Sequence, residues 1–395
     1  QPHTRGGSGI YVEVGAHLTG DDLAISANSA TGDGGGIRNL GMLTLTNSLV
    51  DQNTALHLSG EGTSQGGGIA NEGTIFLSQT QIVSNTALPG EFGEAHGGGL
   101  YNKFNAVATL DNVAIYLNTS VSGGGISSGL GGTGILTLTN SAVFSNTVRR
   151  ESDTAFDPAN GGGIFNGGQL AIVNSTISGN QATDNGGGIF AFPFTETSLN
   201  NVTIANNTAD SDTDAGGDGG GFFHDADSAL SIQNSLVADN LDLSGESPDC
   251  SAGIGVITSG GYNLIETADG CNWPTPETGD QIGTAGDPLL GAPIFSGSTP
   301  LALPLLTGSP AIDAGNPITP GGGGAACAAT DQLGTSRPLG TRCDIGAFEE
   351  EVGVGGTGAG IADIGWIGVG STGAGWMGIG SMGLGGIGAA GAGIG

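Results

Sequence analysis

Residues 34–53 read GGGIRNLGMLTLTNSLVDQN, and this unit recurs along most of the chain. A glycine triplet followed by an apolar residue opens each copy. Further on stand two asparagines six residues apart, as in Asn47 and Asn53. Self-similarity at a period of roughly 20–50 residues is typical of solenoids and other repeat architectures. The triplets begin at Gly34, Gly66, Gly97, Gly123, Gly161, Gly186 and Gly219.

Each unit contains three short segments that alternate apolar and polar residues. In residues 35–53 they are GGIRN, LTLTN and LVDQN. Strands this short, with no helical segment between them, cannot pair inside one unit, but each can pair with its equivalent in the next unit at about 4.8 Å. The sequence therefore predicts an all-β fold, a parallel β-helix with three strands per coil.

The recurring asparagines and glycines suit the corners of such a coil. Asparagine tolerates left-handed backbone dihedrals and can hydrogen-bond neighbouring backbone groups. Asparagines stacked in register form ladders of side-chain amides. Glycine permits a tight corner that other residues resist.

The overall composition excludes several classes of protein. The 395 residues include 81 glycines, which exclude a helix-rich chain because each glycine inside a helix costs about 1 kcal/mol relative to alanine. No strict Gly-X-Y period is present, so the chain is not a collagen. With 7 basic and 37 acidic residues the formal charge is 7 − 37 = −30. Nucleic acid is therefore a poor partner, and acidic polysaccharides and anionic lipids are disfavoured.

The repeat region resembles the polymorphic outer-membrane-protein repeat of bacterial surface adhesins. The resemblance covers roughly residues 6–245 and implies a right-handed parallel β-helix. The residues that carry it best are Gly35-Gly36-Ile37, Gly98-Gly99-Leu100 and Val143-Phe144-Ser145-Asn146.

Composition shifts near residue 245, because 11 of the 15 prolines and all four cysteines follow it. This section resembles the C-terminal region of bacterial surface proteins called choice-of-anchor Q, which implies an envelope or extracellular protein and no particular activity. We therefore predict repeats over 1–245, a disulfide-bearing continuation of the β-helix over 246–351, and a glycine-rich tail over 352–395. The matching blocks are Asp249-Cys250, 261–265, 287–291, 309–315, Asp331-Gln332, Arg337-Pro338 and 343–349.

The cysteines and the N-terminus point to secretion. The chain opens at Gln1 with neither a methionine nor an apolar signal segment, as expected for a processed secreted product. Four cysteines then favour two disulfides in an oxidising compartment. Three connectivities are open, the nearest-neighbour one pairing Cys250 with Cys271 and Cys327 with Cys343, and a zinc site is the alternative.

The tail repeats a pentad, Gly-x-x-Gly-apolar, with Trp366 and Trp376 ten residues apart. It carries no charge after Asp363. Its alternation suggests short strands with one apolar face and one bare glycine face, which allows close approach by another sheet or chain. We expect this tail to be a docking element, on its own solenoid or on a neighbouring subunit. The predicted assembly residues are Trp366, Ile367, Val369, Trp376, Met377 and Ile379.

Catalytic chemistry is hard to find in the sequence. Lys103 and Arg38 are the only basic residues within the regular repeats, and neither lies near an acid cluster in sequence. The best catalytic candidate is His224-Asp225-Ala226-Asp227, for which the alternative is a turn with local hydrogen bonds. The remaining histidines are dispersed. We therefore predict no catalytic residues and no enzyme activity.

A metal site is the more plausible chemistry. Asp210, Asp212, Asp214 and Asp218 occupy positions 1, 3, 5 and 9 of a calcium-type loop. The match is partial, because position 6 is Ala215 and position 12 holds no glutamate. Calcium is the one cofactor that the sequence suggests, and a solvated acidic loop is the alternative.

Taken together, these features predict a secreted structural or adhesive protein of a bacterial cell surface or extracellular matrix. The expected partner is the protein itself, in a fibre joined through the tail and the solenoid ends. Glycans or a neighbouring cell surface are further candidate partners. The rival predictions are a carbohydrate-active β-helix enzyme, either lyase or hydrolase, and a monomeric glycan-binding adhesin.

Overall fold

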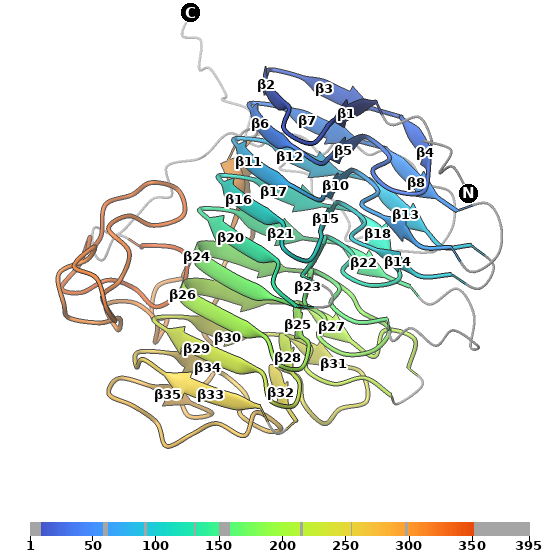
Figure 1. Cartoon of the computed structure of the whole chain (residues 1–395). Coiled ribbons are helices and arrows are strands. Elements are labelled where there is room, and N and C mark those ends of the chain that lie inside the picture. Colours follow the sequence, from blue (N-terminus) through green and yellow to red (C-terminus); the bar gives the residue numbers. More distant parts are fainter. Residues whose placement is uncertain are drawn as a thin grey trace, which may run out of the picture. The chain divides into compact units, whose positions relative to one another are not determined.

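The computed structural model describes residues 9–57, 62–90, 93–129, 132–149, 159–213, 216–253, 255–296 and 299–350. The predicted assembly residues of the tail lie outside these ranges. Within them the chain forms strands and turns, and the stacked parallel strands make a β-solenoid of about 8 turns (Figure 1). None of the described segments is a helix with the length and apolarity of a membrane span. The predicted all-β solenoid fold is confirmed.

The strand that follows each glycine triplet forms the first sheet. Its strands pair parallel and in register, so that Ile37, Ile69 and Leu100 stack inside the solenoid and are fully buried. The members, in spatial order, are β1 (Ile10–Val12), β5 (Ile37–Asn39), β10 (Ile69–Asn71), β15 (Leu100–Asn102), β19 (Ile126–Ser128), β23 (Ile164–Asn166), β25 (Ile189–Ala191), β28 (Phe222–His224) and β32 (Cys250–Ala252).

The two remaining predicted strands of each coil lie in the second sheet. One set is β2 (His17–Asp21), β6 (Met42–Thr46), β11 (Thr74–Ser78), β16 (Val107–Asp111), β20 (Ile135–Thr139), β24 (Gln169–Ser178), β26 (Glu196–Ala205), β29 (Ala229–Gln233) and β33 (Val256–Ser259). The other is β3 (Ala24–Ser26), β7 (Leu49–Asp51), β12 (Gln81–Val83), β17 (Ala114–Tyr116), β21 (Ala142–Phe144), β30 (Leu236–Ala238), β34 (Leu264–Ile265) and β35 (Gln281–Ile282). Strands β24 and β26 are long enough to span both sets.

The structure adds short strands that the sequence pattern does not predict, after the second asparagine of each pair and before the next triplet. They are β4 (Ser29–Thr31), β8 (Thr54–Leu56), β13 (Thr86–Leu88), β18 (Thr119–Ser120) and β22 (Thr147–Val148), with β27 (Thr208–Ala209) and β31 (Leu241–Asp242) further on, and the pair β9 (Ser64–Gln65) and β14 (Ala95–His96). These strands are short because they lie next to the segments of variable length that connect one coil to the next.

The asparagines behave as predicted. The first member of each pair turns a corner in the left-handed conformation, with φ of 49° at Asn47 and 50° at Asn140. The second members form a buried ladder in which each Nδ2 donates to the Oδ1 of the next coil, as from Asn118 to Asn146 at 3.0 Å. We call this the asparagine ladder; its rungs are Asn28, Asn53, Asn85, Asn118, Asn146, Asn180, Asn207 and Asn240.

The first glycine of each triplet also matches its predicted role. At Gly34 φ is +69°, and a Cβ there would lie 2.3 Å from the carbonyl oxygen of Ile37. Only glycine fits a corner that is both left-handed and this tight.

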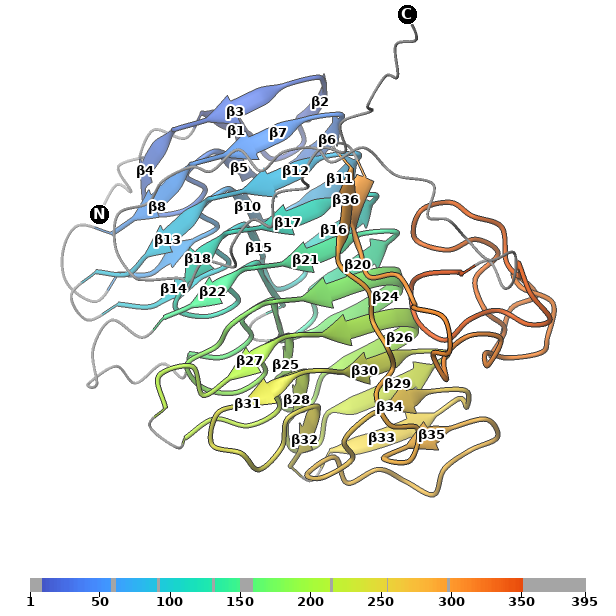
Figure 2. The ribbon, with the colours of Figure 1, turned by 180° about the vertical axis from the view of Figure 1, so that it is seen from behind.

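Strands β33 and β34 pair parallel with β29 and β30, so the first part of the section over 246–351 continues the solenoid as expected. After β35 the chain turns back along the flank of the solenoid, which differs from the expectation for the rest of that section. The antiparallel hairpin β36 (Ile294–Ser296) and β37 (Thr299–Ala302) lies across the outer side of earlier coils (Figure 2). The Phe295 ring packs edge-on against Tyr116 and Phe144, 5.9 and 5.7 Å between centroids. The rest of this section has a glycine run at 321–324, but it contains a single asparagine, Asn316, so the pairs of asparagines six residues apart that accompany each coil are absent from it.

Residues 309–350, here called the C-terminal lobe, dock on the corner asparagines of the later coils. Asn201 Nδ2 donates to the carbonyl oxygen of Gly346 at 3.2 Å, and Asn201 Oδ1 accepts from the amide of Ala328 at 2.9 Å. The amide of Asn316 donates to Asn234 Oδ1 at 3.1 Å. The corner asparagines therefore hold the lobe as well as turning the chain.

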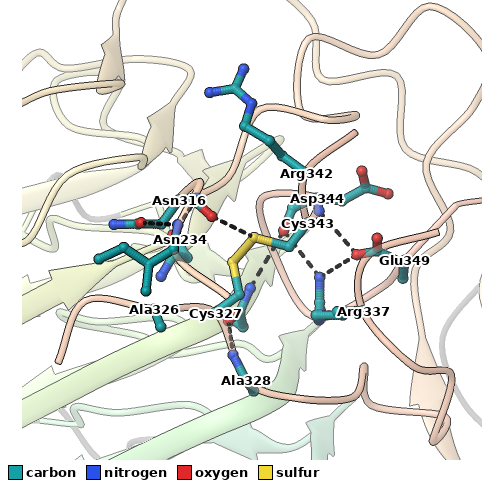
Figure 3. Close-up of a disulfide and its surroundings, with 12 residues drawn as sticks. Asn234, Asn316, Ala326, Cys327, Ala328, Arg337, Arg342, Cys343, Asp344 and Glu349 are labelled. Carbon is teal, nitrogen blue, oxygen red and sulfur yellow. Dashed lines mark hydrogen bonds and ion pairs between the residues drawn. A yellow bond between two sulfur atoms is a disulfide. The ribbon is translucent and has the colours of Figure 1, made fainter. Parts of the chain in front are cut away.

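Inside the lobe, a disulfide and an ion pair hold the chain without regular secondary structure (Figure 3). Cys327 bonds to Cys343, and Arg337 Nη1 lies 2.7 Å from Glu349 Oε2, with both charged side chains fully buried. The other disulfide joins Cys250 to Cys271 beside the last coils. The expected two disulfides are confirmed, and the pairing is the nearest-neighbour one. They fit an oxidising environment such as the outside of the cell.

Candidate functional site

Three charged side chains from consecutive coils meet on the outer face of the first sheet. Arg38 donates to Glu72 Oε1 from Nε at 2.9 Å and from Nη2 at 2.6 Å. Lys103 Nζ donates to Glu72 Oε2 at 2.8 Å. Asp33 lies 3.5 Å from Arg38 Nη2. We call these four residues the Glu72 cluster.

The coil geometry dictates this contact. Asn39, Asn71 and Asn102 form a second amide ladder inside the solenoid, with Nδ2 to Oδ1 distances of 2.7 and 2.8 Å. Glu72 and Lys103 directly follow two of its rungs, so in-register pairing of β10 with β15 sets them about one strand spacing, 4.8 Å, apart. The middle residue of β5, Arg38, points outward and reaches Glu72 from the coil before.

Sequence reasoning missed this site. Neither basic residue lies near an acid cluster in sequence, and 34 and 31 residues separate Arg38 and Lys103 from Glu72. Those separations equal roughly one coil, and distance along the chain is misleading in a solenoid. Counting from the first glycine of each triplet would have placed Glu72 and Lys103 at the same position of consecutive coils, with Arg38 two positions earlier in the coil before.

The cluster is partly shielded from solvent. The side chains of Arg38 and Lys103 are each 30% exposed, Asp33 21% and Glu72 17%. Burial alone would raise the pKa of Glu72, but hydrogen bonds from Lys103 and Arg38 outweigh it and lower that pKa. Burial raises the pKa of Asp33, and Arg38 offsets the rise only in part. Two cations thus face two carboxyl groups, and the cluster is close to neutral.

Aromatic side chains surround the cluster. Tyr11 pairs across the strands with Arg38 and is 38% exposed. Phe104 is 49% exposed, and its ring centroid lies 5.9 Å from Lys103 Nζ, within cation–π range. Tyr101, in contrast, is buried and stacks on His96, and burial raises the pKa of its phenol well above the usual range.

This arrangement favours binding over proton transfer. A general base needs a free lone pair near the working pH. Burial alone would lower the pKa of Arg38, but the hydrogen bond to Glu72 raises it, and the raised pKa of the Tyr101 phenol keeps that group protonated. Exposed rings beside paired charges are, in contrast, typical of ligand recognition.

The second candidate, around His224, lies inside the solenoid. His224 is 1% exposed, and its Nδ1 lies 2.7 Å from Ser228 Oγ. Burial lowers the pKa of the imidazole. Asp225 Oδ1 accepts from the adjacent amide of Ala226. These contacts match the alternative weighed above, a turn with local hydrogen bonds.

The calcium-type loop is described only in part. Asp210 is buried, Asp212 is exposed and Asp218 is half-buried, while Asp214 lies outside the described residues. Burial, then the charges of Asp242 and Glu246, raise the pKa of Asp218. In the described part of the chain no three His, Cys, Asp or Glu side chains gather as metal ligands would. Calcium binding stays a prediction.

No family model, curated protein or solved structure matches the chain.

Proposed function

We propose that this protein is a secreted structural or adhesive component of a bacterial cell surface or extracellular matrix. The observation that carries the proposal is the asparagine ladder, which runs unbroken from Asn28 to Asn240 with every rung after Asn28 buried. Each rung ties two coils together through a buried amide, and such ladders make a solenoid rigid. A rigid stack suits a load-bearing or spacing role.

The proposal includes self-assembly. The apolar tail over 352–395, which carries no charge after Asp363, favours contact with a second copy of the chain, since such a segment is unfavourable in water. Sedimentation velocity of the full chain and of a chain ending at Val352 tests this. Large assemblies formed by the full chain only support the proposal, whereas equal sedimentation of the two chains would remove the tail from it.

The resemblance to surface adhesin repeats and to choice-of-anchor Q proteins supports the cell surface as the location. Antibody labelling of intact cells tests that part. Signal on unpermeabilised cells is expected, and signal that appears only after lysis would contradict it.

The rival function is a polysaccharide lyase or hydrolase. The observation in its favour is the Glu72 cluster, because the outer face of the solenoid brings cations, carboxylates and a tyrosine together. Release of reducing ends or unsaturated products from a polysaccharide panel, lost in Lys103→Ala, would establish the enzyme in place of our proposal.

A further inference from the structure

We propose that the Glu72 cluster, together with the exposed rings of Tyr11 and Phe104, is a binding site for a neutral glycan. The inference deepens the adhesive part of the function proposed above and gives that part a place on the surface. It rests on three features: the two exposed rings, the unused donors of the cluster and its local charge.

The rings lie at the two ends of the cluster. Tyr11 belongs to β1 and Phe104 follows β15, with β5 and β10 between them, so about three strand spacings, roughly 14 Å, separate the strands that carry the two rings. Pyranose rings present C–H faces that stack on aromatic side chains, which supply apolar area and a negative face. Two rings at this separation suit an oligosaccharide that runs along the stack of coils.

The cations keep donors for ligand hydroxyl groups. Within the described residues Arg38 uses Nε and Nη2, which leaves Nη1 available. Lys103 donates one hydrogen bond in the same part of the structure, and an ammonium group carries three N–H donors. Each carboxylate oxygen of Glu72 also has lone pairs that can accept further hydrogen bonds. Paired donors and acceptors of this kind match the vicinal hydroxyl groups of a sugar.

The charge selects the class of glycan. The two cations and two carboxyl groups of the cluster sum to 2 − 2 = 0, in a chain whose formal charge is −30. An acidic sugar would find no net positive potential here and would be repelled by the rest of the surface. A neutral sugar is not repelled in this way, because it carries no charge.

The simpler explanation is that the ion pairs only tie three coils together. That explanation accounts for the contact of Phe104 with Lys103 but gives no role to the exposed half of the Phe104 ring. The test therefore depends on Phe104→Ala, which leaves the ion pairs in place and should not disturb the fold.

The experiment uses the full chain on immobilised neutral polysaccharides (glucan, mannan and xylan) and acidic ones (polygalacturonate and alginate), followed by calorimetry with oligosaccharides of any that bind. We expect binding to at least one neutral glycan, weakened about tenfold by Phe104→Ala and by Lys103→Met. The matched control is Phe194→Ala, which removes an 80% exposed ring from a later coil, away from the cluster. This variant should bind like the wild type.

Three results would overturn the proposal: no neutral glycan binds, acidic glycans alone bind, or Phe104→Ala binds as tightly as the wild type. Equal thermal unfolding of the variants and the wild type makes these outcomes interpretable. Loss of this proposal would leave self-assembly untouched, because assembly is read by sedimentation and needs no glycan.

Discussion

Asn240 donates from Nδ2 to Asp249 Oδ1 at 3.0 Å, and with this contact the asparagine ladder ends on a carboxylate. The rungs from Asn53 to Asn240 both accept and donate, whereas a carboxylate only accepts. Asn263 also donates from Nδ2 to a carboxylate, Asp280 Oδ1, at 3.0 Å. The asparagine ladder therefore ends within the chain, at Asp249. For the proposed fibre we expect the tail, and not the C-terminal coil, to make the contacts between subunits.

Substitution of a rung inside the asparagine ladder should destabilise the protein far more than substitution of the first rung. Asn146→Ala removes the acceptor of two donors on Asn118 and leaves the carbonyl oxygen of Ile115 without its partner. Unsatisfied buried groups cost about 1–3 kcal/mol each, so we expect a loss of about 3 kcal/mol in unfolding free energy. Chemical denaturation measures it. The control is Asn28→Ala at the half-buried end, and equal losses at both positions would contradict the ladder argument.

Asp249 should give the stability of the protein a characteristic pH dependence. Burial raises the pKa of Asp249 to about 7 from 3.8, despite hydrogen bonds from Asn240 and Thr267 that lower it. The folded state then binds the proton more tightly than the unfolded state, so this group's contribution to stability is lost as pH rises from about 4 to 7 and is constant above. Asp249→Asn should flatten this part of the slope when denaturation midpoints are compared at pH 4.5 and 7.5. An unchanged slope would show that Asp249 does not titrate in this window.

Removing only one partner of the buried ion pair in the lobe should lower the free energy of unfolding strongly. Arg337→Met leaves the Glu349 carboxylate buried beside Asp331 and Asp344, and such losses typically reach about 3–5 kcal/mol. The double variant Arg337→Met/Glu349→Gln should recover part of this, because no uncompensated charge remains. Unfolding free energies of the three proteins measure the effect. A double variant less stable than the single one would contradict the explanation.

Much of the fold could be predicted from sequence, because in a solenoid each sequence repeat corresponds to one coil of the structure. Gly34 and the later triplets marked the corner, and Asn53 and its equivalents marked the ladder. The lobe could not be predicted, since contacts such as that between Asn201 and Gly346 join residues 145 apart and follow no repeat. Glu72 was missed for a related reason, because its partners lie one coil away along the chain.

The two disulfides should have separable effects. Removing Cys327–Cys343, which spans 16 residues, should loosen the lobe, at a cost of about 3 kcal/mol in the chain-entropy model. Limited proteolysis of Cys327→Ser/Cys343→Ser should then cut within 309–350 while the coils resist. Cys250→Ser/Cys271→Ser is the matched control and should leave the lobe protected. Equal lobe cleavage in the two variants would contradict the assignment.

Electron-microscope images of the purified full chain, beside a chain ending at Val352, test the central claim most directly. The account predicts regular assemblies of many subunits for the full chain and single particles for the shortened one. Single particles from both chains at the same concentration would contradict it.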